Sequence, residues 1–178
     1  SSGKTIAQMK RANELICCAS NEEFDIGLTE IWRVMKNCMK RGLDEAGSLP
    51  GGLNVKRRAH DIHRQLIEEL GQNDPAPHII NDWISVYAMA VNEENAAGGR
   101  VVTAPKNGAA GIVPAVLKAH LDEHQLNEAG VNRHVSVFLR TATAIGGLFK
   151  MNEVLRTVKD ISYFDYAYLH MHITRVQT

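Results

Sequence analysis

The sequence has 178 residues, of which 44% are apolar, and its twenty basic residues balance twenty acidic ones. A chain of this length is typical of one domain and can bury a core without disulfides or metal ions. The balanced charge does not indicate nucleic acid or an anionic membrane as a partner, and the apolar runs are too short to span a bilayer. Three cysteines without disulfide-framework spacing favour the reducing cytoplasm, so we expect a single cytoplasmic domain over residues 1–178.

Apolar residues recur at three- and four-residue spacing along most of the chain, which predicts a mainly α fold of about six helices. Thr5-Ile6-Ala7-Gln8 has the form of a capping box at the start of the first helix, and Gly42 is expected to close the second. Period-two alternation over residues 161–173 predicts one short strand. The predicted helices cover residues 6–19, 28–42, 59–71, 78–98, 112–125 and 131–150, the last ending in small residues that include Gly146-Gly147.

Residues 96–111 form a long glycine-rich loop between the fourth and fifth predicted helices. As a plain connection, its glycines permit positive φ or close approach of backbones, and Pro105 and Pro114 stiffen its path. A loop of this length without regular structure is unusual inside a compact domain, which favours a binding role. Its glycine spacing fits neither a Walker loop nor a Rossmann fingerprint.

The junction between this loop and the next helix has the features of an anion site. Asn107 is followed by Gly108-Ala109-Ala110-Gly111 and an apolar run, and Pro114 fits only near the first turn of a helix beginning around Ile112. Small side chains leave main-chain N–H groups open to a ligand, and the helix dipole favours a negative group there.

We therefore expect a carboxylate or phosphate at this junction. Arg100 or Lys106 would complete the site with a cation, while Thr103 and Asn107 would orient a neutral polar group.

Three segments together form a sequence pattern that is highly specific for one protein family. They are SLPGGL with VKRRA over residues 48–59, VNEENAAGGRVVTAP over 91–105 and NGAAGIVPAVL over 107–117. In them the chain resembles the catalytic or α portion of the iron–sulfur L-serine dehydratases (L-serine ammonia-lyases) of bacteria. The resemblance runs from about residue 6 to residue 152 and includes AIGGLFK over residues 144–150.

The resemblance implies a mostly helical catalytic domain that converts L-serine to pyruvate and ammonia, in amino-acid degradation and gluconeogenesis. It also implies a 4Fe-4S cluster held by three cysteines, with one iron open as a Lewis acid for the serine hydroxyl. A regulatory β domain or subunit and oligomers are further implied partners. With the substrate carboxylate at the loop–helix junction, the expected substrate-binding residues are Arg100, Thr103, Lys106, Asn107, Gly108 and Ala109. No residue is assigned as the general base.

Two departures from the family pattern matter. Lys106 stands where the family usually has Thr, and it either binds the carboxylate or crowds the substrate. After residue 152 the family continues into a glycine-rich stretch with a cluster cysteine, whereas residues 153–178 contain no Cys, Gly or Pro. We therefore expect a truncated catalytic domain whose cluster ligands lie outside this chain, with no cofactor bound to it and no turnover by itself.

The remaining candidate residues are first interpreted as structural. Cys38 and the adjacent Cys17 and Cys18 are expected to be buried free thiols. Among the histidines, His60 and His63 fit a solvated basic face, His170 and His172 fit an exposed strand face, and His120 and His124 with Glu123 form a weak inverted zincin pattern.

A polar knot of four residues precedes the glycine-rich loop: Asn92, Glu93, Glu94 and Asn95. Helix capping and solvent exposure account for it. Alternatively, Glu94 or Asn95 turns inward to bind the substrate ammonium group.

Two other functions stay open at this point. A pyridoxal-phosphate lyase would use Lys106 for the aldimine, although such a lysine normally lies far in sequence from the phosphate-binding glycines. The second alternative is a non-catalytic helical interaction or folding module that retains only the loop.

Overall fold

The structure is a computed structural model that describes residues 3–16, 20–70, 79–103, 109–157 and 175–176. Helices account for most of this part of the chain, as the sequence predicts, and they form a single helical domain. The elements are α1 (Ile6–Glu14), α2 (Asn21–Asp44), α3 (Ala59–Leu70), α4 (Ile79–Ala96), β1 (Val102–Thr103), α5 (Ile112–His124), α6 (Glu128–Thr157) and β2 (Arg175–Val176).

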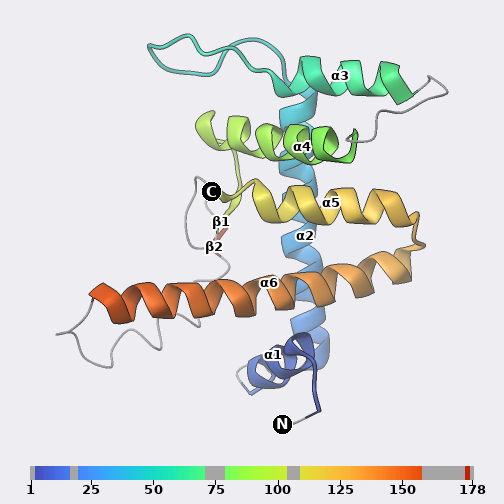
Figure 1. The fold of residues 1–178 in the computed structure, drawn as a ribbon, viewed down its shortest axis with the longest axis vertical. Helices are drawn as coiled ribbons and strands as arrows, with labels where there is room; N and C mark the ends of the chain where they lie inside the picture. The colour runs from blue at the N-terminus through green and yellow to red at the C-terminus, as the bar shows by residue number, and fades with distance from the viewer. Residues whose placement is uncertain (1–2, 17–19, 71–78, 104–108, 158–174, 177–178) are drawn as a thin grey trace.

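The helices are arranged as a stack crossed by one long helix (Figure 1). Helices α3, α4, α5 and α6 lie side by side in that order, and α2 runs across them and packs against all four. A 24-residue helix is about 36 Å long, which is enough to cross neighbouring helices spaced about 9 Å apart. Helix α1 packs against α6 at one end of the stack.

The core follows the face of α2 that meets the stack. Trp32, Met35, Cys38 and Met39 supply this face, and each is almost completely removed from solvent. The stacked helices contribute buried residues that join the same cluster: Leu66 of α3, Val86 and Ala90 of α4, Leu117 of α5, and Val135 and Leu139 of α6. One contiguous core therefore fixes the relative positions of α2 and the stack.

Side-chain caps explain where several helices begin. Thr5 and Gln8 form the predicted capping box at α1, which confirms that prediction. Helix α2 begins at Asn21, earlier than predicted, because the hydroxyl of Ser20 accepts the amide of Glu23 at 3.1 Å. At α6 the side chain of Asn127 accepts the amide of Gly130 at 2.9 Å, so this helix also begins earlier than predicted.

Helix ends were predicted less well than helix starts. Helix α1 ends at Glu14, short of the predicted residue 19, because the chain turns at Leu15. Helix α6 continues to Thr157, so Gly146-Gly147 lies inside it. Gly42 does not close α2 but lies within it, fully packed against α4.

The two short strands differ from the sequence expectation. Val102 and Thr103, predicted as loop, pair antiparallel with Val176 and Arg175 respectively. The predicted strand over residues 161–173 lies outside the described residues. Within the described part of the chain, no helix is both long and apolar enough to cross a membrane.

Candidate substrate-binding site

Three of the six predicted substrate-binding residues are described, and they lie on both sides of a gap in the described chain. Arg100 is exposed and precedes β1, where Thr103 is half-buried, and Ala109 is exposed in the turn before α5. Lys106, Asn107 and Gly108 lie outside the described residues. Their predicted roles therefore stay predictions.

Three glycines in and around the loop have a structural reason of their own. Gly98 adopts a φ of +78°, which a side chain would strain. A Cβ on Gly99 would lie 2.7 Å from the carboxylate of Glu94, and a Cβ on Gly111 would lie 2.5 Å from the carbonyl oxygen of Ala88. The plain interpretation of positive φ and close backbone approach is thus confirmed for these glycines.

The N-terminus of α5 differs from the side-chain-capped starts of α1, α2 and α6. Its N-cap residue is Gly111, and among the described residues no side-chain cap hydrogen bond is made there. Pro114 is buried in the first turn, as the sequence predicts, while Ile112 is 59% exposed. The start of α5 therefore has no side-chain cap of its own to satisfy its first amides.

Glu93 and Glu94 are buried, so the expected solvent exposure of the polar knot is wrong for these two residues, whereas Asn92 is exposed and Asn95 is half-buried. The carboxylate of Glu93 accepts the amide of Arg58 at 2.7 Å and that of Ala59 at 3.4 Å, which caps α3 from a different helix. Helix capping thus explains Glu93 in part, but the helix that it caps is α3 and not its own helix α4.

Glu94 has two arginine partners. Its carboxylate accepts Arg57 Nη1 at 3.1 Å and Arg41 Nε at 2.9 Å, and Arg41 also donates to the carbonyl of Arg100 at 3.0 Å. Since two cations already occupy the Glu94 carboxylate, this geometry does not favour the alternative in which Glu94 binds the substrate ammonium group.

The histidines of α3 are only partly in a solvated basic face. His60 Nδ1 donates to the carbonyl of Leu43 at 2.9 Å, and the ring of His63 meets that of Trp83 edge-on at 5.7 Å. Burial lowers the pKa of His63, and the nearby Asp44 opposes this only in part. Their neighbours Arg58 and Arg64 are exposed, as expected.

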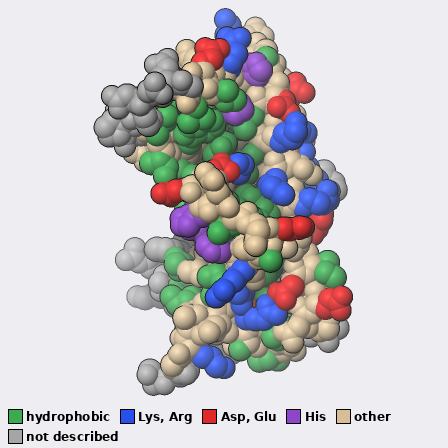
Figure 2. Space-filling view, turned by 90° about the vertical axis from the view of Figure 1, so that its right-hand side faces the viewer, with side chains coloured by type: hydrophobic (Ala, Val, Ile, Leu, Met, Phe, Trp, Pro, Cys, Tyr) green, Lys and Arg blue, Asp and Glu red, His purple; other side chains and the backbone are tan. Residues whose placement is uncertain are grey.

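His120 and His124 form a cluster with His134 of α6, which sequence reasoning missed. His120 Nε2 and His134 Nδ1 share a hydrogen bond of 2.9 Å, and His124 Nδ1 donates to the His120 carbonyl at 2.8 Å. A group of histidine side chains is visible near mid-height at the left of Figure 2. Within the described residues, no group of three or more His, Cys, Asp or Glu side chains is arranged to hold a metal ion. His170 and His172 lie outside the described residues.

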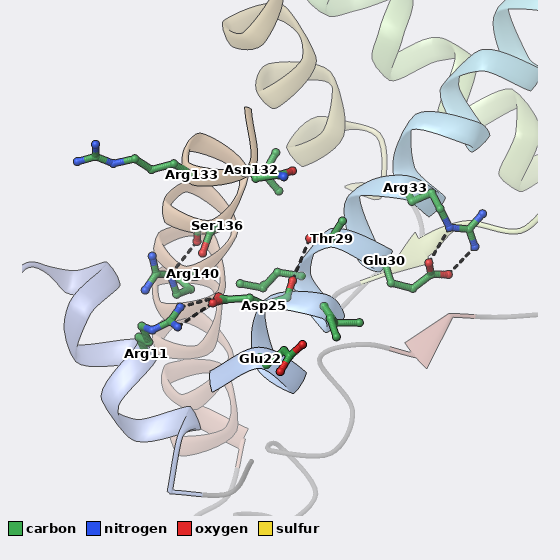
Figure 3. A pocket seen from close by; sticks show the side chains of 13 residues that line it. Arg11, Glu22, Asp25, Thr29, Glu30, Arg33, Asn132, Arg133, Ser136 and Arg140 are labelled. Atoms are coloured by element: carbon green, nitrogen blue, oxygen red, sulfur yellow. Dashed lines mark hydrogen bonds and ion pairs between the residues drawn. The ribbon is translucent and has the colours of Figure 1, made fainter. Parts of the chain in front are cut away.

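A separate, open cavity of about 690 Å³ lies between α1, α2 and α6 (Figure 3). Arg11 donates to both carboxylate oxygens of Asp25 there, at 2.6 and 2.8 Å, and this hydrogen-bonded pair lowers the pKa of Asp25. Arg140 also lines the cavity, and its Nε donates to the backbone carbonyl of Ser136 at 2.8 Å. None of the predicted substrate-binding residues lines this cavity.

In a comparison with known protein families, the model described as serine dehydratase alpha chain matches residues 1–155 of this chain. The chain is 50% identical to an L-serine dehydratase of Streptomyces coelicolor over 151 residues, which are 84% of this chain and 31% of that protein. It is also 50% identical to L-serine dehydratase TdcG of Escherichia coli over 153 residues, which are 84% of this chain and 32% of that protein. An L-serine dehydratase of Helicobacter pylori is 39% identical over 156 residues, 85% of this chain and 32% of that protein.

The chain belongs to the serine dehydratase alpha-chain family. It spans about a third of the length of the curated relatives that it matches. The fold and the polar knot described above are therefore those of a member of this family.

The described part of this chain does not fit an iron–sulfur cluster. Cys38 is 1% exposed in the core, where burial raises the pKa of its thiol to about 11 and so opposes the thiolate that a cluster needs. This confirms the prediction of a buried free thiol at Cys38. Cys17 and Cys18 lie outside the described residues.

Proposed function

We propose that this chain supplies the substrate-carboxylate site of an L-serine dehydratase that converts L-serine to pyruvate and ammonia. The start of α5 carries the proposal, because a glycine-rich loop ends there at an N-terminus without a side-chain cap. Relatives about half identical to this chain bear the name L-serine dehydratase, which supports L-serine as the ligand.

In this proposal the amides around Gly108 to Gly111 hold the serine carboxylate. Arg100, Thr103, Lys106 and Asn107 surround the same place and fix the orientation of the substrate. Lys106 adds a second cation, which the usual Thr of the family does not provide.

The rest of the activity is proposed to come from outside this chain. A 4Fe-4S cluster, when bound, would supply a Lewis acid for the departing hydroxide. Its ligands would be cysteines of the remaining part of the enzyme, since the described residues here do not fit the cluster. A regulatory β domain or subunit, a homo-oligomer, a cytoplasmic location and a role in gluconeogenesis belong to the same proposal.

Titration of the chain with L-serine, with malonate as a mimic, tests the carboxylate site. Amide NMR shifts at Gly108 to Gly111 should change at millimolar ligand, whereas those at the start of α1, which Thr5 already caps, should not. Ala109→Asp places a competing carboxylate at the site and should abolish the shifts. Ala129→Asp, an exposed alanine at the start of α6, is the matched control and should leave them unchanged.

Absence of shifts at Gly108 to Gly111 in the unmodified chain would remove the carboxylate site and leave a helical interaction module. A visible absorption band on adding pyridoxal phosphate, lost in Lys106→Ala, would instead favour the pyridoxal-phosphate alternative.

A further inference from the structure

Exposed aliphatic side chains form two rows on the hairpin of α5 and α6. Ile112 and Val116 are one turn apart on α5 and are 59% and 37% exposed. On α6 the spacing of Val137, Ile145 and Leu148 places them on one face of the helix, and they are 43%, 44% and 63% exposed. Isolated exposed aliphatics are common on protein surfaces, but aligned rows on adjacent helices are not.

The hydrogen bond between His120 and His134 shows that the two rows are adjacent. His120 continues the α5 row one turn after Val116, and His134 precedes Val137 by three residues on α6. These two histidines are in contact and α5 and α6 are antiparallel. Both rows therefore extend in the same direction from the contact between the histidines. We name this surface the hairpin ridge: Ile112, Val116, His120, His134, Val137, Ile145 and Leu148.

The hairpin ridge lies on the side of the stack away from α2. Val135 and Leu139 of α6 are buried in the core that α2 shares, and Val137 is turned about 200° around the helix axis from Val135. On α5, Leu117 is completely buried, and the exposed Ile112 and Val116 are turned about 140° and 100° from it around the helix axis. Figure 1 shows α2 crossing one side of the stack, and none of the described helices crosses the other side in this way.

We infer that the hairpin ridge is the surface on which the rest of the serine dehydratase packs. The relatives contain about twice as many further residues as the part that this chain matches, since it covers 31–32% of their length. A remainder of that size is expected to contact the matched part, and the exposed aliphatic residues of the ridge fit an apolar surface of the same enzyme. The inference rests on the proposed function only in taking the chain as part of such an enzyme.

The test uses the remainder of Escherichia coli L-serine dehydratase TdcG, expressed without the 153 residues that match this chain. Co-expressed with this chain, it should form a complex of fixed stoichiometry on size-exclusion chromatography. Val137→Glu and Ile145→Glu should each weaken the measured Kd at least tenfold, because they place a charge in an apolar contact.

Two matched controls carry the same change at exposed aliphatics elsewhere. Ile26→Glu on α2 and Leu53→Glu before α3, at 62% and 89% exposure, should bind like the unmodified chain. Equal weakening by all four variants, or none by the ridge variants, would overturn the inference. A homodimer of this chain that the ridge variants dissociate would overturn it as well, since a second copy would then occupy the surface.

A second measurement covers a remainder that does not fold alone. This chain is placed in TdcG as a replacement for the matched segment, and melting temperatures are compared with those of the isolated chain. The ridge variants should lower the melting temperature of the chimera and leave that of the isolated chain unchanged. Equal effects on the chimera and on the isolated chain would overturn the inference. The serine titration at Gly108 to Gly111 tests the proposed function separately.

Discussion

Arg57 and Glu94 form an ion pair with 3.1 Å between Nη1 and Oε1, and their side chains are only 9% and 6% exposed. Arg41 reaches the other oxygen of the same carboxylate from α2, and its side chain is 43% exposed. Three parts of the fold thus meet at one buried charge: α2, the segment before α3, and the end of α4. The glycine-rich loop begins directly after this point. The ion pairs of Glu94 therefore fix the position of the chain where this loop starts.

Arg57→Met should lower the free energy of unfolding by about 3 kcal/mol, because it leaves the buried carboxylate of Glu94 with only the more exposed Arg41. Urea unfolding followed by circular dichroism measures the change. Arg33→Met is the matched control, since Arg33 and its partner Glu30 are both solvent-exposed, and it should change stability little. Equal losses in the two variants would show that the burial of the pair does not matter.

Gly42 provides a second, geometric test. A Cβ at this position would lie 2.2 Å from the carbonyl oxygen of Ala90, so Gly42→Ala must push α2 away from α4. We expect a loss of at least about 2 kcal/mol, as for other overpacked core sites. Thermal or urea unfolding measures it.

Gly27→Ala is the control on the same helix, because nothing lies within 4 Å of the added Cβ. Alanine favours the helix over glycine by up to about 1 kcal/mol, so this variant should be more stable than the unmodified chain. Stabilisation by both substitutions would contradict the close approach of α2 and α4.

Local signals in the sequence predicted the starts of α1 and α5 correctly but missed the side-chain caps that begin α2 and α6. Thr5 and Gln8 reveal the start of α1, and the same logic applied to Ser20 and Glu23 would have found the start of α2. Gly42 was misread because a glycine that ends a helix and one that meets a neighbouring helix look alike in sequence. Only the position of Ala90, on another helix, distinguishes them.

The burial of Glu93 and Glu94 beside the candidate site was not predicted, because their charges are compensated over long sequence distances. Glu94 and Arg41 are 53 residues apart, and no local pattern pairs them. An acidic pair at a helix end ordinarily indicates exposure, since burying a carboxylate is costly without partners. His134 was missed for the same reason, as its contact with His120 depends on the α5–α6 turn.

The stability of the domain should fall as the pH drops below about 6.5, the ordinary histidine pKa. Burial lowers the pKa of His120 in the fold, the neighbouring His124 and His134 lower it further, and Glu123 opposes them. The unfolded chain therefore binds more protons than the folded one between the two pKa values, and the free energy of unfolding rises with pH in that window.

Urea unfolding at a series of pH values from about 5 to 8 measures this slope. His120→Gln should reduce the slope, and His63→Gln should reduce it independently, because burial lowers the pKa of His63 as well. Together the two substitutions should flatten the profile more than either alone. A profile unchanged by both variants would contradict the assignment of the slope to these rings.

Cys38 should resist thiol reagents in the folded protein and take no part in cluster binding. Its side chain is 1% exposed and burial raises its pKa to about 11, so both access and the thiolate form are disfavoured. In a background with Cys17 and Cys18 changed to Ser, labelling by a disulfide reagent at neutral pH should be slow in buffer and complete in urea.

Anaerobic incubation of the unmodified chain with iron and sulfide should give no brown cluster and no serine-dependent pyruvate, and the cysteine variants should behave alike. Rapid labelling of Cys38, or a cluster that Cys38→Ala abolishes, would show that this thiol is reached by opening of the core between α2 and α4.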